Sequence, residues 1–384
     1  MANRQKIMIV AGEASGDGHA AKLVRAFRKA EPQTEFEFFG AAGPEMREAG
    51  VEAVVESDGL SIVGLAEIGR ALPMFLRASR DLKEVAGTRK PDVVVLVDFP
   101  DFNLKLAKSL KKKGFKIAYY ISPQLWAWRK YRVATVKNYV DLMLTILPFE
   151  KDWYTKQGVS HVEYVGNPLA REVHSTRSKE EFCRDHILNP NKPIISLLPG
   201  SRHKEIVRIF PVMLDAATKM SVANPDFQFI VAIASKRNRD DVNNAINAAG
   251  SVPPNLKIVE NETYDALNAS DAAAVASGTA TLETGIIGTP MTIVYKTSAI
   301  NYGLLEPIIS VEHYGLINLI AGERVATELI QGRFMTDTLS SELLRLLEPK
   351  VNAEMRLKLR ETADKLGPGG ASRRAAEAIL RLLT

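Results

Sequence analysis

The stretch VVVLVDFPDFNLKLAK, residues 93–108, decides the fold. Its first five residues are apolar, which predicts a strand buried on both faces, and a helical pattern follows at 103–113. A buried strand that leads into a helix is the repeating unit of a doubly wound α/β domain. Asp98, Asp101 and Asn103 follow the strand within six positions, so polar side chains gather at its carboxyl end.

The same alternation recurs along the chain. In the first half, apolar runs predict further strands at 6–12, 35–43, 116–122, 141–147 and 162–166, and a helix at 67–86. In the second half, they predict strands at 193–200, 227–234, 256–260, 271–277 and 290–296. The fold predicted is therefore α/β, with two Rossmann-like domains that face each other across a cleft.

The domain boundaries follow from this pattern. We expect a first domain at 1–170, a second at 171–350 and a hinge near 167–192. The segment past residue 337 reads as helix, broken by GPGG at 367–370. We expect the C-terminal helices, 351–384, to pack back on a first-half domain of the same chain or of a partner copy, so a homodimer is compatible with the sequence.

The composition narrows the class of protein. The 384 residues are 46% hydrophobic and 25% charged, which is ordinary for a soluble globular protein, and no window holds the roughly 20 apolar residues of a membrane span. The single cysteine, Cys183, excludes a disulfide framework and fits a reducing cytoplasm. A net charge of +5 favours anionic partners. Nucleic acid is not expected, because no recognition motif is visible.

The turn AGEASGDGHAAKL, residues 11–23, joins the first strand to a helix through a glycine-rich bend. It is not GxGxxG, and its acids Glu13 and Asp17 argue against phosphate, so an acceptor hydroxyl or sugar fits better. Ser15 either caps the helix or contacts the acceptor, and the whole stretch also reads as an ordinary capped turn. His19 is either a base or a surface residue.

Two turns of the second half favour a sugar nucleotide. In LLPGSRHKEI, residues 197–206, Gly200 and Ser201 open a helix whose first turn carries Arg202, an arrangement that suits a diphosphate.

In ASGTATLETG, residues 276–285, the small residues Ser277, Gly278 and Thr279 leave N–H groups for a phosphate. Glu283 follows Thr279 by one helical turn and can accept hydrogen bonds from a ribose diol. The alternative is a capped helix with a solvated glutamate.

For three other stretches the sequence allows either a structural role or a contact with ligand or lipid. Trp126 and Trp128 in ISPQLWAWRKYR, residues 121–132, are either core residues or ligand contacts, and Asn318 is either a turn-former or a ligand contact. The segment 60–84 is apolar around much of its helical axis and carries arginines, so it is either buried or in contact with anionic lipid. The residues of this segment that we assign to lipid contact are Ile62, Val63, Leu72, Met74, Phe75, Leu76 and Arg77.

No metal or other cofactor is expected. The six histidines are scattered, and no DxD triplet is present. Asp98 and Asp101 could in principle hold Mg²⁺, but Arg202 already supplies a countercharge for a diphosphate.

Taken together, AGEASGD, DFPDFN, SPQLWAWR, LPFE, LLPGSR, ASGTATLET and LINLIAG resemble the lipid-A-disaccharide synthase family, in order and over nearly the whole chain. The resemblance implies a GT-B glycosyltransferase, peripheral on the cytoplasmic face of the inner membrane of Gram-negative bacteria. It implies condensation of UDP-2,3-diacylglucosamine with 2,3-diacylglucosamine 1-phosphate (lipid X) to a β-1,6 disaccharide and UDP. The family's apolar region, proposed to reach lipid, corresponds to residues 60–84. One departure is GNPLAR, residues 166–171, where the family often has histidine in place of Asn167.

The resemblance also assigns roles to single residues. Asp98 matches an aspartate thought to take part in catalysis, Arg202 the arginine of LPGSR, and Glu283 the acid that holds the nucleotide ribose. Asn318 matches an asparagine associated with the donor.

We therefore expect Asp98 to act as the base of an inverting reaction, with His19 in reserve. Asp101 and Glu13 would shape the acceptor side. The alternatives are a UDP-sugar 2-epimerase, another GT-B transferase, and a sugar-nucleotide-binding protein without catalysis.

Overall fold

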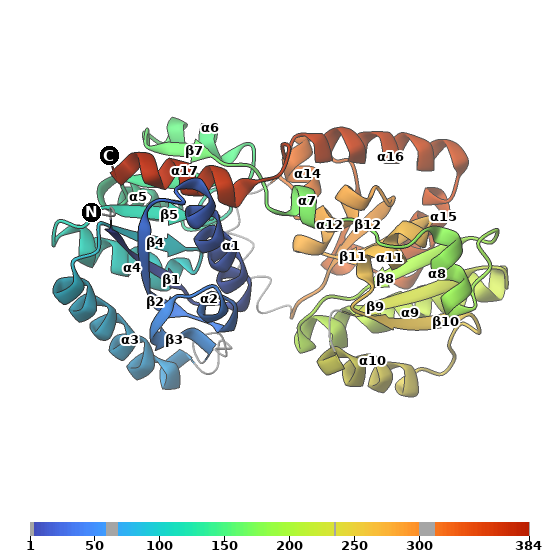
Figure 1. The fold of residues 1–384 in the computed structure, drawn as a ribbon. Coiled ribbons are helices and arrows are strands. Elements are labelled where there is room, and N and C mark those ends of the chain that lie inside the picture. The colour runs from blue at the N-terminus through green and yellow to red at the C-terminus, as the bar shows by residue number, and fades with distance from the viewer. Residues whose placement is uncertain (1–3, 59–67, 234–235, 299–311, 384) are drawn as a thin grey trace. The chain divides into compact units, whose positions relative to one another are not determined.

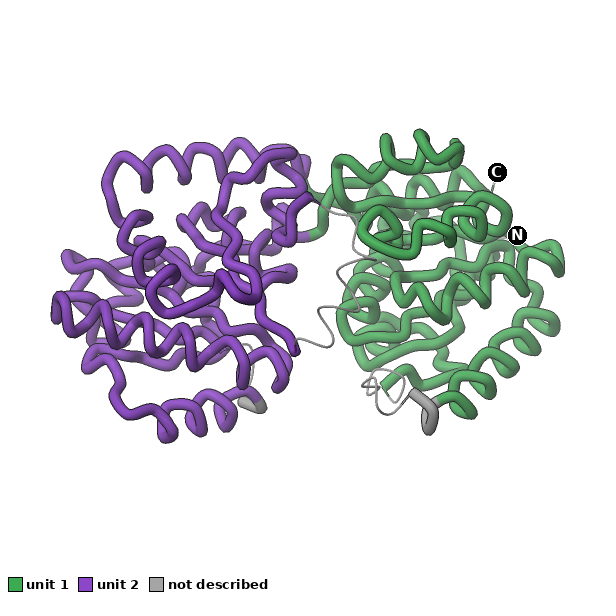
Figure 2. Tube along the Cα trace, turned by 180° about the vertical axis from the view of Figure 1, so that it is seen from behind, with its two compact units in different colours: residues 1–168, 369–384 green, residues 169–368 purple. Residues whose placement is uncertain are grey.

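The computed structural model of the chain describes residues 4–58, 68–233, 236–298 and 312–383. The chain divides into two compact units, unit 1 with residues 1–168 and 369–384, and unit 2 with residues 169–368 (Figure 2). In each unit, helices cover a parallel sheet (Figure 1). The prediction of two doubly wound α/β domains is thus confirmed.

Unit 1 has a seven-stranded sheet in its described part, in the order β3-β2-β1-β4-β5-β6-β7. Its strands are β1 (Arg4–Ala11), β2 (Glu35–Ala42), β3 (Glu52–Glu56), β4 (Val93–Val97), β5 (Ile117–Tyr120), β6 (Leu142–Thr145) and β7 (Val162–Tyr164). Its helices are α1 (Ala14–Ala30), α2 (Pro44–Glu48), α3 (Ile68–Arg89), α4 (Pro100–Lys111), α5 (Val133–Tyr139), α6 (Glu150–Lys156) and α17 (Ala371–Leu383).

Two hydrophobic clusters cover the two faces of this sheet. Side chains alternate along a strand, so Ile7 and Ile9 of β1 belong to one cluster and Met8 and Val10 to the other. All five residues of β4 are buried, as the run VVVLV predicts for a central strand.

Unit 2 has a six-stranded sheet in its described part, in the order β10-β9-β8-β11-β12-β13. Its strands are β8 (Ile194–Leu198), β9 (Gln228–Ile233), β10 (Leu256–Glu260), β11 (Ala272–Ala276), β12 (Met291–Tyr295) and β13 (Thr327–Ile330). Its helices are α7 (Leu169–Glu172), α8 (Lys179–His186), α9 (His203–Ala223), α10 (Lys236–Ala248), α11 (Thr263–Ala269), α12 (Thr279–Ile287), α14 (Leu316–Ala321), α15 (Thr336–Leu346) and α16 (Pro349–Asp364).

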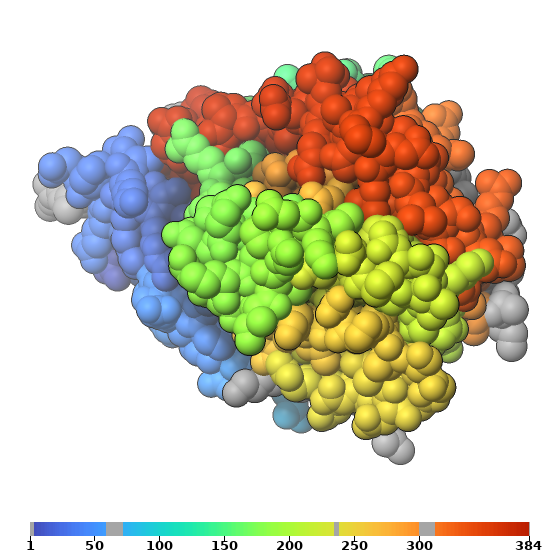
Figure 3. Space-filling view, turned by 90° about the vertical axis from the view of Figure 1, so that its right-hand side faces the viewer, coloured from blue at the N-terminus to red at the C-terminus, as the bar shows by residue number. Residues whose placement is uncertain are grey.

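An ion-pair network fixes the start of unit 2 to the N-terminal turn of helix α11. Figure 3 shows residues near 180, in green, beside residues near 260, in yellow. Here Arg177 pairs with Glu262 and donates from Nε to Asp265, 3.1 Å away. The chain from Arg177 onward is therefore held to unit 2.

Two strands were not anticipated, β3 and β13. Each forms one end of its sheet, and their sequences, EAVVE and TELI, carry charged side chains among the apolar ones. The glutamates of β3 face solvent, as an edge strand allows, whereas Glu328 of β13 is buried and paired with backbone amides; in both strands the charged residue weakens the apolar signal.

The C-terminal helices differ from the expectation that all of 351–384 packs on a first-half domain. Only α17 lies in unit 1, where its Ala375 and Ile379 join the hydrophobic cluster beside α1. Helix α16 belongs to unit 2, because Arg356 donates to the carbonyl oxygens of Gly288 and Ser270, at 2.9 and 3.2 Å. The break at GPGG is where the chain leaves unit 2 for unit 1.

The strand order reverses at one place in each sheet. In unit 1, β1 pairs with β2 on one side and β4 on the other; in unit 2, β8 pairs with β9 and β11 in the same way. In open α/β sheets, ligands bind at the carboxyl ends of the strands at such switch points. These two places are where the turns singled out from the sequence lie.

Candidate functional site

A pocket of about 360 Å³ opens at the switch point of unit 2. The turn after β8 and the turn after β11 form its walls, since Leu198 and Val275 are register partners in the two strands. The lining residues that the sequence singled out are Gly200, Ser201, Arg202, Ser277, Gly278, Thr279 and Glu283. Tertiary structure thus brings together two motifs that are about 75 residues apart.

Arg202 forms the cationic side of this pocket. Its side chain is 83% exposed, and Nη1 lies 3.0 Å from Oε1 of Glu205. The other oxygen of Glu205 accepts the backbone N–H groups of Ser201 and Arg202, each at 3.3 Å. A carboxylate therefore occupies the place where a helix N-terminus and a guanidinium would receive an anion.

Gly200 is required at this turn. Its φ of 106° is in the region that favours glycine, and an added Cβ would lie 2.6 Å from Oε2 of Glu205. The glycine therefore lets the carboxylate approach the backbone.

Glu283 forms the opposite side of the pocket, half-buried on α12. Its Oε1 accepts a hydrogen bond of 3.0 Å from the hydroxyl of Tyr264 on α11. Burial raises the pKa of the Glu283 carboxyl, and the hydrogen bond from Tyr264 partly offsets this rise. The second carboxylate oxygen of Glu283 can accept hydrogen bonds from a diol.

Two residues that were expected to contact the sugar nucleotide, Ser277 and Asn318, have hydrogen-bond partners within the protein. The N–H of Ser277 donates to the carbonyl of Val294 at 2.9 Å, so this amide is committed to the sheet and not to a phosphate. Asn318 is buried: its Nδ2 donates to Ala326 and Glu328, at 2.8 and 3.0 Å, and its Oδ1 accepts from the amide of Ala326. Its side chain holds α14 to β13, and the expected contact with the donor is not supported.

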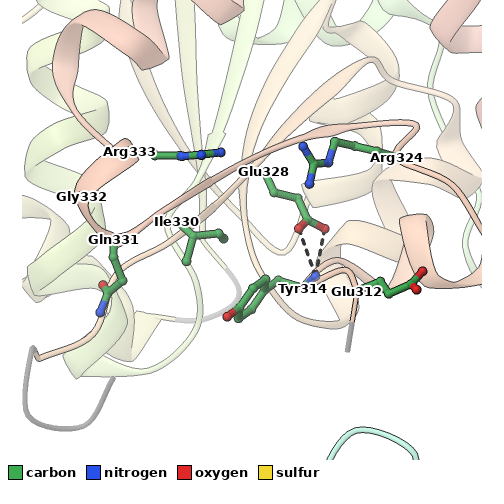
Figure 4. Close-up of a pocket in the computed structure, with 8 residues that line it drawn as sticks. All are labelled: Glu312, Tyr314, Arg324, Glu328, Ile330, Gln331, Gly332 and Arg333. Atoms are coloured by element: carbon green, nitrogen blue, oxygen red, sulfur yellow. Dashed lines mark hydrogen bonds between the residues drawn. The ribbon is translucent and has the colours of Figure 1, made fainter. Parts of the chain in front are cut away.

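Glu328 organises the segment that supports Ser277 (Figure 4). Its carboxylate accepts the backbone N–H groups of Tyr314 and Gly315, at 3.0 and 2.9 Å. The carbonyl of Tyr314 in turn accepts the Ser277 hydroxyl at 2.9 Å. A second hollow of about 430 Å³ lies along this segment, lined by Glu328, Arg324 and Arg333 among others.

Asp98 lies at the switch point of unit 1, directly after β4 and half-buried. Burial and the nearby Glu13 carboxylate raise the pKa of Asp98 to about 6. A carboxylate with this pKa is still ionised at neutral pH and is a stronger base than an exposed one. Asp98 therefore has the basicity that its predicted role as a general base requires.

Asp101 has a different environment from the one expected. It accepts hydrogen bonds from the guanidinium groups of Arg129, at 2.6 Å, and Arg132. Partial burial raises the pKa of Asp101, but the two arginines outweigh it and leave the pKa below its usual value. Asp101 is thus an ion-pair anchor for the loop after β5, and the role on the acceptor side that the sequence suggested stays a prediction.

The first turn presents Glu13 and Ser15 to solvent and turns Asp17 inward. The Asp17 carboxylate accepts the amides of Gly43 and Glu45, both at 2.8 Å, and so caps α2. His19 is half-buried on α1. Glu13 and Ser15 are therefore accessible, and Asp17 is structural.

The two tryptophans have different roles. Trp126 is buried, and its Nε1 donates to Glu150 at 3.1 Å, so it belongs to the core. Trp128 is exposed, with the Arg129 guanidinium 4.1 Å from its ring centroid. Glu150 also accepts the amide of Leu147 at 3.0 Å, and burial raises the pKa of its carboxyl to about 7. This buried acid fixes the loop that carries Trp128.

The segment assigned to lipid contact is partly described. Ile62 and Val63 lie outside the described residues. On α3, Leu72 is 54% and Leu76 63% exposed, Arg77 is exposed, and Met74 and Phe75 are half-buried. No described helix has the length and apolar content to cross a bilayer.

Four residues of these sites were not assigned a role from the sequence: Tyr264, Glu205, Glu328 and Glu150. Tyr264 precedes Glu283 by 19 positions and lies on another helix, so no local pattern joins them. Glu205 was visible as the third residue of its helix, where a glutamate is a known capping partner.

The comparisons with known proteins extend over the whole chain. A family model for lipid-A-disaccharide synthetase matches residues 7–380. A lipid-A-disaccharide synthase of Myxococcus xanthus is 42% identical, over 100% of this chain and 99% of that protein. The one of Geobacter sulfurreducens is 41% identical, over 98% of this chain and 97% of that protein.

Solved structures share the fold at low sequence identity. A putative UDP-N-acetylglucosamine 2-epimerase from Listeria monocytogenes superposes with a TM-score of 0.65 and 16% identity, over 98% of this chain and 96% of that one. The calicheamicin glycosyltransferase CalG4 gives 0.62 and 14%, over 100% and 99%. The fold is GT-B. By its family match and its full-length relatives, this chain belongs to the lipid-A-disaccharide synthase family of glycosyltransferases.

Proposed function

We propose that this enzyme condenses UDP-2,3-diacylglucosamine with 2,3-diacylglucosamine 1-phosphate (lipid X), giving the β-1,6-linked disaccharide 1-phosphate and UDP with inversion. Family membership supports lipid A disaccharide synthesis. The observation that supports the donor half is the single pocket that Arg202, Glu283 and the turns after β8 and β11 line together.

The donor binds unit 2 in this proposal. The diphosphate takes the position that Glu205 holds now, against Arg202 and the first amides of α9. The ribose hydroxyls donate to Glu283, whose carboxylate is already oriented by Tyr264. The leaving UDP gains negative charge, which Arg202 and the N-terminus of α12 stabilise.

Asp98 of unit 1 is the base. The oxygen of the acceptor 6-hydroxyl attacks the anomeric carbon as its proton passes to Asp98, and the bond from that carbon to the UDP oxygen breaks. One displacement turns an axial donor into a β-linked product. His19 of α1 remains the second candidate for the base, and Glu13, Ser15 and Trp128 border the acceptor.

The substrates carry acyl chains, which requires contact with a lipid surface. Leu72 and Leu76 expose apolar side chains on α3 next to the cation Arg77, the combination that suits an anionic bilayer. We propose peripheral attachment to the cytoplasmic face of the inner membrane through this helix.

The deciding experiment incubates the purified enzyme with UDP-2,3-diacylglucosamine and lipid X, and in parallel with UDP-N-acetylglucosamine. Mass spectrometry and NMR of the anomeric carbon should show a β-linked disaccharide only with the acylated pair. Asp98→Asn, with the same shape and no base, should lower kcat by about 10²–10⁴. Epimerised UDP-sugar would identify a 2-epimerase, and UDP binding without turnover would identify a binding protein.

A further inference from the structure

The backbone at Asp98 and Phe99 is left-handed in two successive residues. The φ angles are 48° and 51°, and neither residue is glycine. Side chains with a Cβ avoid this region, and such residues persist only where their surroundings hold them. The turn that presents the proposed base is therefore a strained one.

Asn103 and Tyr119 supply the hydrogen bonds that hold this turn. The Nδ2 of Asn103 donates to the carbonyl oxygens of Val97 and Asp98, at 3.2 and 2.8 Å. The hydroxyl of Tyr119, on the neighbouring strand β5, donates to the same Asp98 oxygen at 2.6 Å. Both side chains are fully buried.

Packing closes the turn from the other side. The Phe99 ring lies against Gly12, where an added Cβ would come within 2.2 Å of it. Phe99 also contacts Phe75 and Phe102, with ring centroids 6.0 and 5.7 Å away. Because residue 98 follows β4 directly, a fixed φ at 98 and 99 fixes the direction in which the Asp98 side chain leaves the sheet.

A helix start does not require this arrangement. A serine or aspartate in extended conformation would cap α4 without strain, whereas its cap residue is Phe99, which makes no side-chain capping bond. The two N–H groups of the buried Asn103 side chain bond the carbonyls of residues 97 and 98. This side chain therefore orients the turn.

We propose that Asn103, assisted by Tyr119, is a positioning residue that aims the Asp98 carboxylate at the acceptor hydroxyl. The inference rests on the proposed function, since it assigns Asn103 a share in the proton transfer. Asn103 touches no reacting atom and acts through the backbone of Asp98.

The charged and titratable groups around Asp98 come from the turn before α1, from β5, from α4 and from the segment after β5. Glu13 lies on the turn before α1 and raises the pKa of Asp98. Tyr119 is on β5, and the pair formed by Asp101 of α4 and Arg132 lies close enough to influence the pKa of Tyr119. A change at Asn103 substitutes none of these groups, so any effect on Asp98 comes through the turn.

The test compares Asn103→Leu, which keeps the shape and removes both hydrogen bonds, with Tyr119→Phe, which removes one. We expect kcat to fall about 10- to 100-fold in Asn103→Leu and less in Tyr119→Phe, because a small misplacement of a reacting group costs about that factor. KM for the UDP-sugar should change less than about twofold, since the donor binds unit 2 in the proposed function. In the profile of kcat against pH, the acidic limb should move from its wild-type position.

Thr289→Val is the control. It removes a buried hydroxyl that donates to Leu267 at 2.7 Å in unit 2, and it should lower stability alone.

Crystal structures give a readout that does not need activity. In Asn103→Leu we expect φ of Asp98 or Phe99 to leave the left-handed region. An unchanged turn, or an unchanged kcat and acidic limb, would overturn the inference while the wild-type enzyme still makes disaccharide. Wild-type enzyme that makes no disaccharide would instead refute the proposed function. If Asn103→Leu fails to fold, Tyr119→Phe decides by the same two measurements.

Discussion

The carboxylate of Glu205 lies 3.0 Å from the guanidinium of Arg202 and accepts the backbone amide of Arg202 as well. The pocket proposed for the donor thus contains an anion of its own, at the position proposed for the diphosphate. A ligand that must displace this carboxylate binds with its intrinsic affinity multiplied by the fraction of sites that the carboxylate has left.

Glu205→Gln should therefore tighten UDP binding, by about 3- to 10-fold, because the neutral amide competes less well for Arg202. Isothermal titration calorimetry with UDP measures this directly. The control is Glu342→Gln on α15, which breaks an equivalent pair three residues apart, with Glu342 2.7 Å from Arg345. Weaker UDP binding in Glu205→Gln would show that capping α9 is the main role of Glu205.

Tyr264→Phe should weaken the recognition of ribose. Without the 3.0 Å hydrogen bond, the Glu283 carboxylate loses its fixed orientation toward the diol. We expect wild-type enzyme to bind UDP about tenfold more tightly than 2′-deoxy-UDP. In Tyr264→Phe this ratio of affinities should be about two- to fivefold smaller. Competitive inhibition by both nucleotides gives the ratio. Tyr154→Phe, which removes a buried hydroxyl bonded to Pro123 at 3.0 Å in unit 1, should keep the wild-type ratio.

Leu72→Glu and Leu76→Glu should release the enzyme from anionic membranes. Each places a negative charge on the exposed apolar side of α3, next to Arg77. The affinity for phosphatidylglycerol vesicles, measured by co-sedimentation, should fall about 30-fold for the double variant, since each of the two charges opposes binding by about 1 kcal/mol near such a surface. Leu357→Glu on α16, where the leucine is equally exposed at 54%, is the matched control. Equal loss in the control would remove α3 from this role.

Glu150 should make the stability of the enzyme depend on pH. Burial raises the pKa of this carboxyl to about 7, above its usual 4.5, so its contribution to stability is complete below pH 4.5 and is lost as the pH rises through 7. Wild-type enzyme should therefore lose about 1–3 kcal/mol of unfolding free energy between pH 5 and 8 relative to Glu150→Gln. Urea denaturation at the two pH values measures the difference. The raised pKa of Asp98 acts in the same direction in both proteins and cancels. Parallel losses in both proteins would contradict the prediction.

The sequence predicted the fold well because parallel strands are buried on both faces. Runs such as VVVLV and IISLL predict strands that are buried on both faces, and in the structure each forms a central strand, β4 and β8. The edge strands β3 and β13 were missed because charged residues interrupt their apolar runs: the two glutamates of β3 are exposed, and Glu328 of β13 is buried and bonded to the backbone amides of Tyr314 and Gly315.

The site was predicted in part, and the failures have a common cause. Arg202 caps the helix after β8 and Glu283 lies in the helix after β11, so the order of strand and helix brings both to the ligand edge of the sheet. Asp101 and Asn318 stand in similar places, but their side chains are taken up by Arg129 and Arg132 and by Ala326 and Glu328. Whether a polar side chain is available depends on partners that are distant in the sequence.

The sequence by itself determined the two α/β units, the switch-point turns and the acid at the end of β4, because these follow from local apolar periodicity and from the order of strands. Only the tertiary structure decided which of the polar residues are free to act. It placed Glu205 in the anion position, Tyr264 on Glu283, and Asn103 and Tyr119 on the carbonyl of Asp98. The physical reason is that hydrogen bonds and burial depend on distances between elements, and these distances are set by packing, which no local pattern encodes.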